Sequence, residues 1–331
     1  MTAHDDRFPG SSKPSPPLRA RHERRSPLPG QQPKSSEDDA LAPERVRRLV
    51  ESASYREADE DPELLQHPQM RGVRLQLDYW KAEDALLSHG IERTIVVFGS
   101  TRIAEPTAAR RRLEAARAAL AAAPDDPERQ RAVRAAERIV AKSGYYDVAR
   151  EFGRIVGKAG NGAHPHALVI MTGGGPGIME AANRGAYDVG AKTVGLNIRL
   201  PQPQFPNPYL TPELCFRFHY FAIRKLHFLL RARALVVFPG GYGTMDELFE
   251  TLALVQTRTI AALPIVLVGE RYWRHAIDFD FLVEEGVIDP EDVELFWYAE
   301  TADEIWTGID AWHAGQTPSP PAGTGRVQPA P

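Results

Sequence analysis

Several features that would point to particular classes of protein are missing from this sequence. It contains one cysteine, Cys215, which excludes an internal disulfide and fits a reducing compartment. No apolar run is long enough to cross a membrane, and the polar N-terminus lacks the apolar core of a signal peptide. We therefore expect a cytoplasmic protein with no membrane partner. The formal net charge of −4 does not favour nucleic acid as a partner.

Common ligand-binding signatures are missing as well. The 10 histidines form no cluster with metal-ligand spacing, so we expect no metal. No Lys-Ser/Thr pair follows a glycine loop as in a Walker A motif, and no clean G-x-G-x-x-G occurs. The strand "TVGLNI" ends at Asn197, without the acid that would bind the ribose of a dinucleotide. A mononucleotide therefore fits better than NAD.

The composition divides the chain into a central domain and two tails. Residues 1–43 are rich in Pro, Ser, Arg and Gln, and residues 315–331 have a similar bias. Such segments bury too little apolar surface to offset the entropy of ordering, so we predict that both tails are disordered. Residues 44–314 are predicted to form one domain, which begins with a helical extension over 44–92.

From residue 93 onward, short apolar runs alternate with amphipathic helical patterns. This alternation predicts βαβ units and a parallel sheet covered on both faces, a doubly wound, Rossmann-like α/β fold. An Ala/Arg-rich segment at about 107–142 is divided by "PDDP", which predicts an inserted helical hairpin. The predicted strands lie in "TIVVF", "ALVIM", "TVGLNI", "CFRFHY", "ALVVF", "PIVLVG" and "VELFWY".

Three loops that follow predicted strands carry unusual chemistry. In an open α/β sheet, ligands bind at the carboxyl ends of the strands. Two of the loops run directly into helices, whose free amides and positive dipole ends favour an anion. We expect a phosphate at residues 240–244, although tight strand–helix turns would also explain the glycines. The candidate binding residues are Gly99 and Ser100 in the first loop, Gly173, Gly174, Gly175 and Gly177 in the second, and Gly240, Gly241, Gly243 and Thr244 in the third.

Charged residues near the third loop suggest that the ligand is processed as well as bound. Glu247 follows Gly243 by one helical turn and can share its face, whereas Asp246 could serve only the helix dipole. Arg224 and Lys225 interrupt an otherwise apolar helix, where burial is costly unless they meet an anion. The alternative is that both side chains extend to solvent.

These motifs resemble those of a known family. "PGGYGTMDE" matches the PGGxGTxxE signature of the LOG family, once labelled lysine decarboxylase-like, and "FAIRKLHF" resembles its Arg-Lys helix. "TGGGPGIMEAANRGA" and "VGLNIRLP" are similar to the longer bacterial branch of that family. The resemblance covers about residues 71–312. The inserted hairpin is longer than the link typical of the family after the first strand.

The resemblance implies a nucleoside 5′-monophosphate phosphoribohydrolase, which splits the N-glycosidic bond of AMP or a cytokinin ribotide to give the free base and ribose 5-phosphate. It implies that Arg224 and Glu247 are the catalytic pair, that residues 240–244 form the phosphate loop, and that residues 173–177 line the pocket. It further implies a homodimer or a higher homo-oligomer, with no cofactor. Glu180 and Asp246 are weak candidates for a second carboxylate.

Three other functions stay open on the sequence. A pyridoxal phosphate-dependent decarboxylase would need a Schiff-base lysine, for which Lys225 is the well-placed candidate. A non-catalytic nucleotide or molybdenum-cofactor carrier would share this type of fold, but has no need of Glu247. A regulatory nucleotide sensor could use the hairpin as its output element.

Overall fold

The computed structural model describes residue 28 and residues 30–161, 168–202 and 204–315. The predictions of disorder for the two tails therefore fall largely outside the described residues. The chain divides into two compact units, Met1–Met70 and Arg71–Pro331. The first unit contains two helices joined by short 3-10 turns: α1 (Ala42–Val50) and α2 (Pro62–Gln66), which is capped by the Asp61 side chain.

The second unit is built on a seven-stranded sheet in which every neighbouring pair is parallel. The strand order is β4-β3-β2-β1-β5-β6-β7, so the chain winds first to one side of β1 and then to the other. This confirms the predicted doubly wound α/β fold. The strands are β1 (Arg93–Phe98), β2 (Leu168–Thr172), β3 (Thr193–Ile198), β4 (Cys215–Phe218), β5 (Ala232–Val237), β6 (Ile265–Val268) and β7 (Trp297–Ala299).

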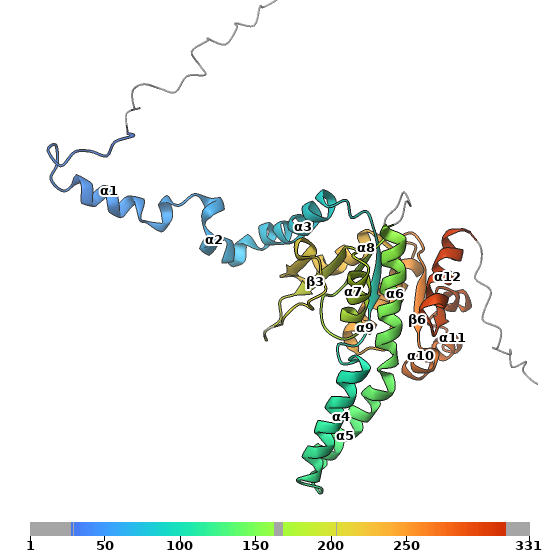
Figure 1. Ribbon diagram of the computed structural model, residues 1–331. Coiled ribbons are helices and arrows are strands. Elements are labelled where there is room, and N and C mark those ends of the chain that lie inside the picture. Colours follow the sequence, from blue (N-terminus) through green and yellow to red (C-terminus); the bar gives the residue numbers. More distant parts are fainter. Residues whose placement is uncertain (1–27, 29, 162–167, 203, 316–331) are drawn as a thin grey trace, which may run out of the picture. The chain divides into compact units, whose positions relative to one another are not determined.

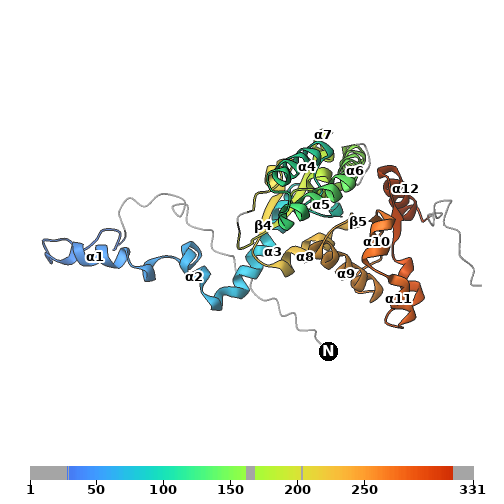
Figure 2. The same ribbon diagram turned by 90° about the horizontal axis from the view of Figure 1, so that it is seen from below.

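Alternate side chains of each central strand pack into two separate hydrophobic cores, one on each face of the sheet. In β1, Val96 and Phe98 pack on one face, whereas Ile95 and Val97 pack on the other. The first core is covered by α3, α8, α9, α10 and α11, and the second by α6, α7 and α12 (Figure 2). These helices are α3 (Arg71–Ser88), α6 (Gly144–Asn161), α7 (Ile178–Asp188), α8 (Phe221–Leu230), α9 (Tyr242–Gln256), α10 (Glu270–Ala276), α11 (Phe279–Glu284) and α12 (Ala302–His313).

The inserted segment forms the predicted helical hairpin. Its helices, α4 (Pro106–Ala121) and α5 (Pro127–Lys142), run side by side away from the sheet (Figure 1). Asp126 caps α5 through the amides of Glu128 and Arg129. The hairpin ends at Lys142, immediately before α6 begins at Gly144, so its base returns to the sheet.

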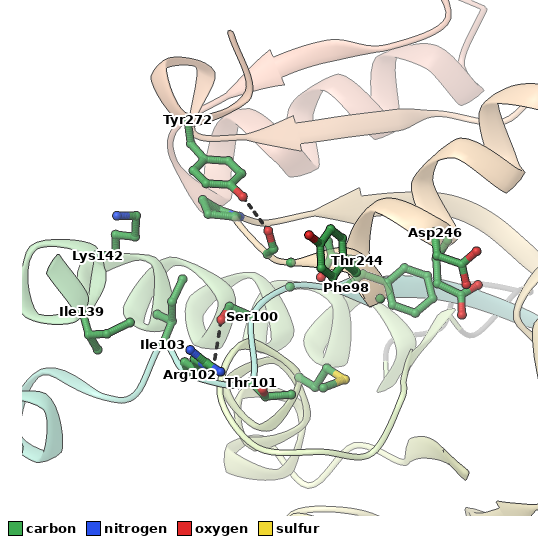
Figure 3. A pocket seen from close by; sticks show the side chains of 18 of the residues that line it. Phe98, Ser100, Thr101, Arg102, Ile103, Ile139, Lys142, Thr244, Asp246 and Tyr272 are labelled. Atoms are coloured by element: carbon green, nitrogen blue, oxygen red, sulfur yellow. Dashed lines mark hydrogen bonds between the residues drawn. The ribbon is translucent and has the colours of Figure 1, made fainter. Parts of the chain in front are cut away.

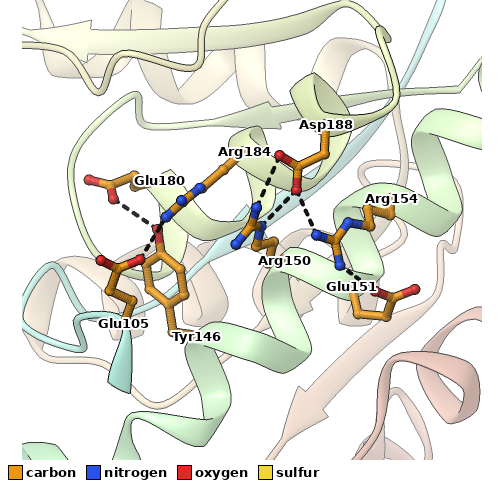
Figure 4. Close-up of polar contacts among 8 residues, drawn as sticks. All are labelled: Glu105, Tyr146, Arg150, Glu151, Arg154, Glu180, Arg184 and Asp188. Atoms are coloured by element: carbon orange, nitrogen blue, oxygen red, sulfur yellow. Dashed lines mark hydrogen bonds and ion pairs between the residues drawn. The ribbon is translucent and has the colours of Figure 1, made fainter. Parts of the chain in front are cut away.

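Helices α6 and α7 pack closely because glycines face backbone at their contact. A Cβ added to Gly153 would overlap the carbonyl oxygen of Ala182, and one added to Gly185 would overlap that of Arg150. Polar contacts flank this approach (Figure 4). Asp188 accepts hydrogen bonds from Arg150 at 2.7 Å and Arg154 at 2.9 Å. Helix α6 precedes β2 and helix α7 follows it, so this packing fixes both ends of β2.

The last strand of the sheet is shorter than the sequence predicts. The run "VELFWY" predicts a strand, but Val293 and Glu294 belong to a 3-10 turn and β7 begins only at Trp297. The turn forms because Asp289 and Asp292 make a reciprocal capping box, which overrides the β propensity of the run. The segment "YWRHAIDFDFLVEEG" is mostly helical, in α10 and α11, and the Asp278 side chain caps the start of α11. No helix among the described residues has both the length and the apolar character of a membrane span.

Candidate active site

A large cavity opens where the strand order reverses, between β1 and β5. Such a switch point is where ligands bind in open α/β sheets. The cavity has a volume of about 560 Å³, which falls within the range of small-molecule sites. Figure 3 shows the side chains around it. They come from the end of β1 and the loop after it, from the loop after β5, from the first turns of α7, α8 and α9, from α10, and from the end of α5.

Backbone hydrogen bonds hold the three predicted loops together at this point. The amide of Ser100 donates to the carbonyl oxygen of Pro239 at 2.9 Å, which ties the β1 loop to the β5 loop. The amide of Ile178 donates to the carbonyl oxygen of Ser100 at 3.2 Å, which ties the start of α7 to the same place. A Cβ on Gly99 would meet Ile178 at 2.7 Å, so Gly99 makes this approach possible. Gly99 and Ser100 both line the cavity.

The β5 loop presents open backbone to the cavity. Gly240, Gly241, Gly243 and Thr244 all line it, and α9 begins at Tyr242 with Gly241 as its N-cap. A Cβ on Gly241 or Gly243 would meet no atom within 4 Å, so the space beside this backbone is free. Amides in the first turn of a helix lack intrahelical partners. The loop therefore combines open space, donor groups and the positive end of a helix dipole, as an anion site requires.

Arg224 and Glu247 face each other across the cavity. Nη1 of Arg224 lies 4.0 Å from Oε1 of Glu247, and their side chains are 13% and 8% exposed. This distance is too long for a hydrogen bond, so both groups keep bonding capacity for a ligand. Nε of Arg224 donates to the carbonyl oxygen of Leu196 at 2.7 Å, and its guanidinium lies over the Phe228 ring. The arginine is thus held in place independently of Glu247.

Burial dominates the electrostatics of Glu247. Removal from water raises its pKa to about 7, although the positive charges of Arg224 and Lys225 act in the opposite direction. Burial also lowers the pKa of Arg224. A carboxyl group whose pKa lies near neutrality, inside a cavity and beside a cation, has the properties of an acid–base catalyst.

Asp246 and Lys225 behave differently from their neighbours along the chain. Nζ of Lys225 lies 2.8 Å from Oδ1 of Asp246 and 3.3 Å from Oε2 of Glu250, so its charge is shared between two acids. Lys225 does not line the cavity, whereas Asp246 lies at its edge. Burial alone would lower the pKa of Lys225, but hydrogen bonding to Asp246 and the charge of Glu250 raise it overall. The predicted role of Lys225 in substrate binding stays a prediction.

The β2 loop is close to the site but does not line the cavity. The spaces where side chains would stand on its first three glycines are filled by other residues: Arg224 and Met179 at Gly173, Asn197 at Gly174 and Met179 at Gly175. A Cβ on Gly177 would overlap the backbone of Ser100. The structure therefore places Gly173, Gly174, Gly175 and Gly177 behind the cavity wall, where Gly173 leaves room for the guanidinium of Arg224. Their predicted contact with substrate stays a prediction.

Glu180 also points away from the cavity. It lies in the first turn of α7 and accepts a hydrogen bond of 2.9 Å from the hydroxyl of Tyr146 (Figure 4). The same hydroxyl lies 3.4 Å from Nη1 of Arg184, which in turn pairs with Glu105 at 2.7 Å. These contacts connect α6, α7 and the segment before α4. Glu180 does not line the cavity, and its predicted role as a second carboxylate stays a prediction.

Several residues line the cavity without having been predicted from the sequence, among them Tyr272, Met179, Ile139 and Lys142. The hydroxyl of Tyr272 donates to the carbonyl oxygen of Gly240 and so braces the β5 loop. Met179 covers the β2 loop, while Ile139 and Lys142 reach the cavity from the end of the inserted hairpin. Topology could have located Lys142. Because α6 runs from the carboxyl edge of the sheet back to the start of β2, the residue just before α6 must lie at that edge.

Comparisons with known proteins show which proteins this chain is similar to. A family model described as possible lysine decarboxylase matches residues 179–309. The cytokinin riboside 5′-monophosphate phosphoribohydrolase LOG3 of Arabidopsis thaliana is 30% identical over 169 residues, which cover 50% of this chain and 74% of that protein. A probable enzyme of the same description, LOGL3 of Oryza sativa subsp. japonica, is 27% identical over 156 residues, covering 44% and 68%.

The doubly wound sheet, with a glycine loop and a buried Arg–Glu pair at its switch point, defines an α/β protein with a candidate active site. The chain belongs to the LOG family, also called lysine decarboxylase-like. Among solved structures, a molybdenum cofactor binding protein from the phototrophic bacterium Rippkaea orientalis is 17% identical, with a TM-score of 0.36, and the match covers 66% of this chain and 95% of that one.

Proposed function

We propose that the protein hydrolyses the N-glycosidic bond of a nucleoside 5′-monophosphate, of the AMP or cytokinin ribotide type, to the free base and ribose 5-phosphate. The observation that supports it best is the position of Glu247. This buried carboxyl group lies one turn after an open anion loop and 4.0 Å from a fixed arginine. The names of the Arabidopsis and rice relatives describe the same class of reaction.

The phosphate and the glycosidic bond are given separate places in this proposal. The open backbone of the β5 loop binds the 5′-phosphate, which leaves the sugar beside the next turn of α9. As the C1′–N bond breaks, positive charge develops at C1′. The carboxylate of Glu247 stabilises that charge and accepts a proton from the water that attacks C1′. The base departs with the bond's electron pair and takes up a proton.

Arg224 acts as the fixed partner of this reaction centre. Its guanidinium donates in a planar fork, which suits the hydroxyl groups or phosphate of a ribotide. Because Leu196 and Phe228 hold it, the arginine keeps its position when the substrate enters. Arg224 also keeps part of the Glu247 population ionised, since its charge lowers a pKa that burial alone would raise further.

A panel of nucleotides tests the proposal. The protein is incubated with AMP, GMP, CMP, UMP and a prenylated AMP, and the released bases are identified by chromatography. We expect base release from at least one monophosphate, and a much lower kcat/KM for the matching nucleoside, because the loop amides then lose their anion. Equal kcat/KM for the two would contradict the phosphate loop. Tight binding without any base release would favour a nucleotide or cofactor carrier instead.

We also propose that the protein forms at least a homodimer. Large apolar side chains are exposed on two helices that contact each other, α3 and α8, among them Leu77, Trp80 and Leu226. Exposed apolar side chains that share a face are typical of protein interfaces. Light scattering at several concentrations checks the mass, and a monomer throughout would contradict the proposal.

A further inference from the structure

The charged groups of the cavity are separated between its two ends. Figure 3 shows Asp246 at one end, beside the Glu247 turn, and Lys142 and Arg102 at the other, with Thr244 of the β5 loop between them. Within the described part of the chain, neither Lys142 nor Arg102 forms an ion pair, whereas Lys225 near the acidic end is paired twice. The β5 loop therefore has acids on one side and free cations on the other.

A second cavity continues the basic end. It has a volume of about 470 Å³ and shares Lys142 and Tyr272 with the first. The remaining polar lining consists of Tyr145, Arg271 and His275, with no acid among the lining residues. Nδ1 of His275 donates to the carbonyl oxygen of Arg271 at 2.7 Å, which leaves Nε2 for another partner. Arg271 forms no ion pair with any other described residue.

Tyr272 connects this second cavity to the β5 loop. Its hydroxyl donates to the carbonyl oxygen of Gly240, while its ring lies in the walls of both cavities. The carbonyl oxygen of Gly240 is thus occupied, and the loop is held with its open side toward the cavity. An anion that binds beside Tyr272 lies next to the loop and within the basic region.

We propose that Lys142, Arg271 and His275 form a second anion-binding subsite, which takes the second phosphate of a nucleoside 5′-diphosphate whose first phosphate lies on the β5 loop. The inference rests on the proposed function, because that function places the sugar and the glycosidic bond at the acidic end. The phosphate chain must then extend in the opposite direction. There the lining of the second cavity supplies cations and no carboxylate, although the charge of Glu300 acts on Tyr145 in its wall.

The arrangement differs from an ordinary solvated basic surface in two respects. Exposed cations on protein surfaces are generally interspersed with acids, and α4 and α5 show this pattern in the Arg117–Glu137 pair at 2.8 Å. Here the basic groups come from two separate elements, α5 and α10, and converge on one recess with aromatic walls. The inserted hairpin supplies Lys142, so the insertion would contribute to which nucleotides the protein binds.

Calorimetric binding of AMP and ADP tests the subsite. The titrations use the full chain carrying Glu247→Gln, so that hydrolysis does not consume the ligand, in a buffer without divalent cations. We expect ADP to bind about tenfold or more tightly than AMP, as one added charge-assisted contact provides. Adding Arg271→Ala should remove most of that advantage and leave the affinity for AMP within about twofold. The ADP advantage should also shrink as salt rises, since the cations are open to solvent.

Arg134→Ala serves as the matched control, because Arg134 is an exposed cation on α5 that lines neither cavity. It should leave both affinities unchanged. If ADP binds no more tightly than AMP, or if Arg271→Ala weakens both nucleotides equally, the subsite is overturned. Base release from AMP in the wild type would then leave the proposed function standing. Conversely, tighter ADP binding that depends on Arg271, without base release from any nucleotide, would support the subsite and contradict the proposed function.

Discussion

The two glycine loops of the sheet edge, at residues 173–177 and 240–244, look alike in sequence but differ in what occupies the space beside them. A Cβ on Gly241 or Gly243 would meet nothing within 4 Å. A Cβ on Gly174 would overlap the side chain of Asn197, and one on Gly177 would overlap the backbone of Ser100. In the β5 loop Gly240 makes room for the Thr244 side chain, but Gly241 and Gly243 leave space that a ligand can fill, whereas all four glycines of the β2 loop make room for the protein itself.

Hydrogen bonds to neighbouring residues also hold the β2 loop, which comprises residues 173–177. The amide of Gly174 donates to Oγ1 of Thr172 at 2.9 Å, and the carbonyl oxygen of Gly174 accepts from the amide of Asn207 at 2.8 Å. Asn207 also donates to the carbonyl oxygen of Gly175 at 3.1 Å. The amide of Gly174, a donor that could bind a phosphate, is therefore already occupied, and the loop is held in place by Asn207. We infer that the β2 loop (residues 173–177) is a support loop for Arg224, while the β5 loop (residues 240–244) is the ligand loop.

Glu247→Gln gives the largest effect that this comparison predicts. The amide keeps the size of the acid but loses the negative charge opposite the developing positive charge at C1′. We expect kcat to fall by roughly 10²–10³, about 3–4 kcal/mol, while nucleotide affinity survives. Base release and calorimetry measure the two quantities.

Asp246→Asn is the matched control for this experiment. Asp246 is the adjacent residue, but its carboxylate is paired with Lys225 at 2.8 Å and half exposed, so we expect little change in kcat. If Asp246→Asn inactivates the enzyme while Glu247→Gln leaves it active, then Asp246 rather than Glu247 is the catalytic carboxylate.

A pair of glycine substitutions tests the difference between the loops directly. Gly177 has φ +76°, a conformation that side chains rarely adopt, and faces backbone. Gly177→Ala should therefore destabilise the fold by about 2–4 kcal/mol. Gly243→Ala should change stability by less than about 1 kcal/mol, since alanine favours a helix and nothing stands in its way. It should instead weaken nucleotide binding by filling the open space.

Urea unfolding and AMP binding separate these two outcomes. If Gly243→Ala unfolds the protein, or if Gly177→Ala retains full stability, the distinction between a ligand loop and a support loop is lost. A Gly243→Ala protein with wild-type affinity would also count against the ligand loop, whatever its stability.

Much of this arrangement was predictable from local patterns. Alternating apolar runs and helices predicted the doubly wound sheet, because period and turn residues are properties of the chain itself. The run "PGGYGTMDE" likewise predicted a glycine loop at the start of a helix and an acid one turn later, and the structure has both. The two loops could not be told apart, however, since both present glycines between a strand and a helix. What fills the space beside Gly174 is Asn197, on another strand, and no local pattern contains that information.

The same limit applies to the charged residues. Sequence placed Arg224 and Lys225 together on one helix, but a separation of one residue sends the two side chains in different directions. Arg224 meets the carbonyl oxygen of Leu196, while Lys225 meets Asp246 and Glu250. The contribution of Lys142 and Tyr272 also depends on how distant elements meet at one edge. Such contacts are set by topology and packing rather than by periodicity.

The pH dependence of stability tests whether the carboxyl group beside the ligand loop, that of Glu247, costs free energy of folding when it is ionised. No such buried acid is part of the support loop at residues 173–177. Burial raises the pKa of Glu247 to about 7 from its ordinary value of 4.5, so the folded state binds this proton more tightly than the unfolded state. Wild type therefore loses stability as pH rises from about 4.5 to 7, where the buried group must ionise. Glu247→Gln removes that cost. We expect the variant to be more stable than wild type by about 1–3 kcal/mol at pH 8, with the gap closing near pH 5.

Urea unfolding of both proteins at the two pH values measures this difference. The activity of the wild type should follow the same ionisation, with kcat/KM falling below about pH 7 as the carboxylate is protonated. Equal stability of the two proteins at pH 8, or a rate that rises on acidification, would contradict the ionised role of Glu247.

The smallest expected effect concerns Lys225, which lies just outside the cavity that the ligand loop lines. Its ion pair with Asp246 joins a largely buried amine to a carboxylate that is 53% exposed, and pairs of this kind contribute about 0–1 kcal/mol. Lys225→Met should therefore cost less than about 1 kcal/mol in unfolding free energy and change kcat/KM by only a few-fold. The raised pKa keeps the amine charged at neutral pH, unlike a Schiff-base lysine, which needs a depressed one. Lys225→Arg is the control, since it keeps the charge that pairs with Asp246 and Glu250. Near-complete loss of activity in Lys225→Met, with the fold intact by urea unfolding, would place Lys225 among the substrate-binding residues and move the boundary of the site beyond Asp246.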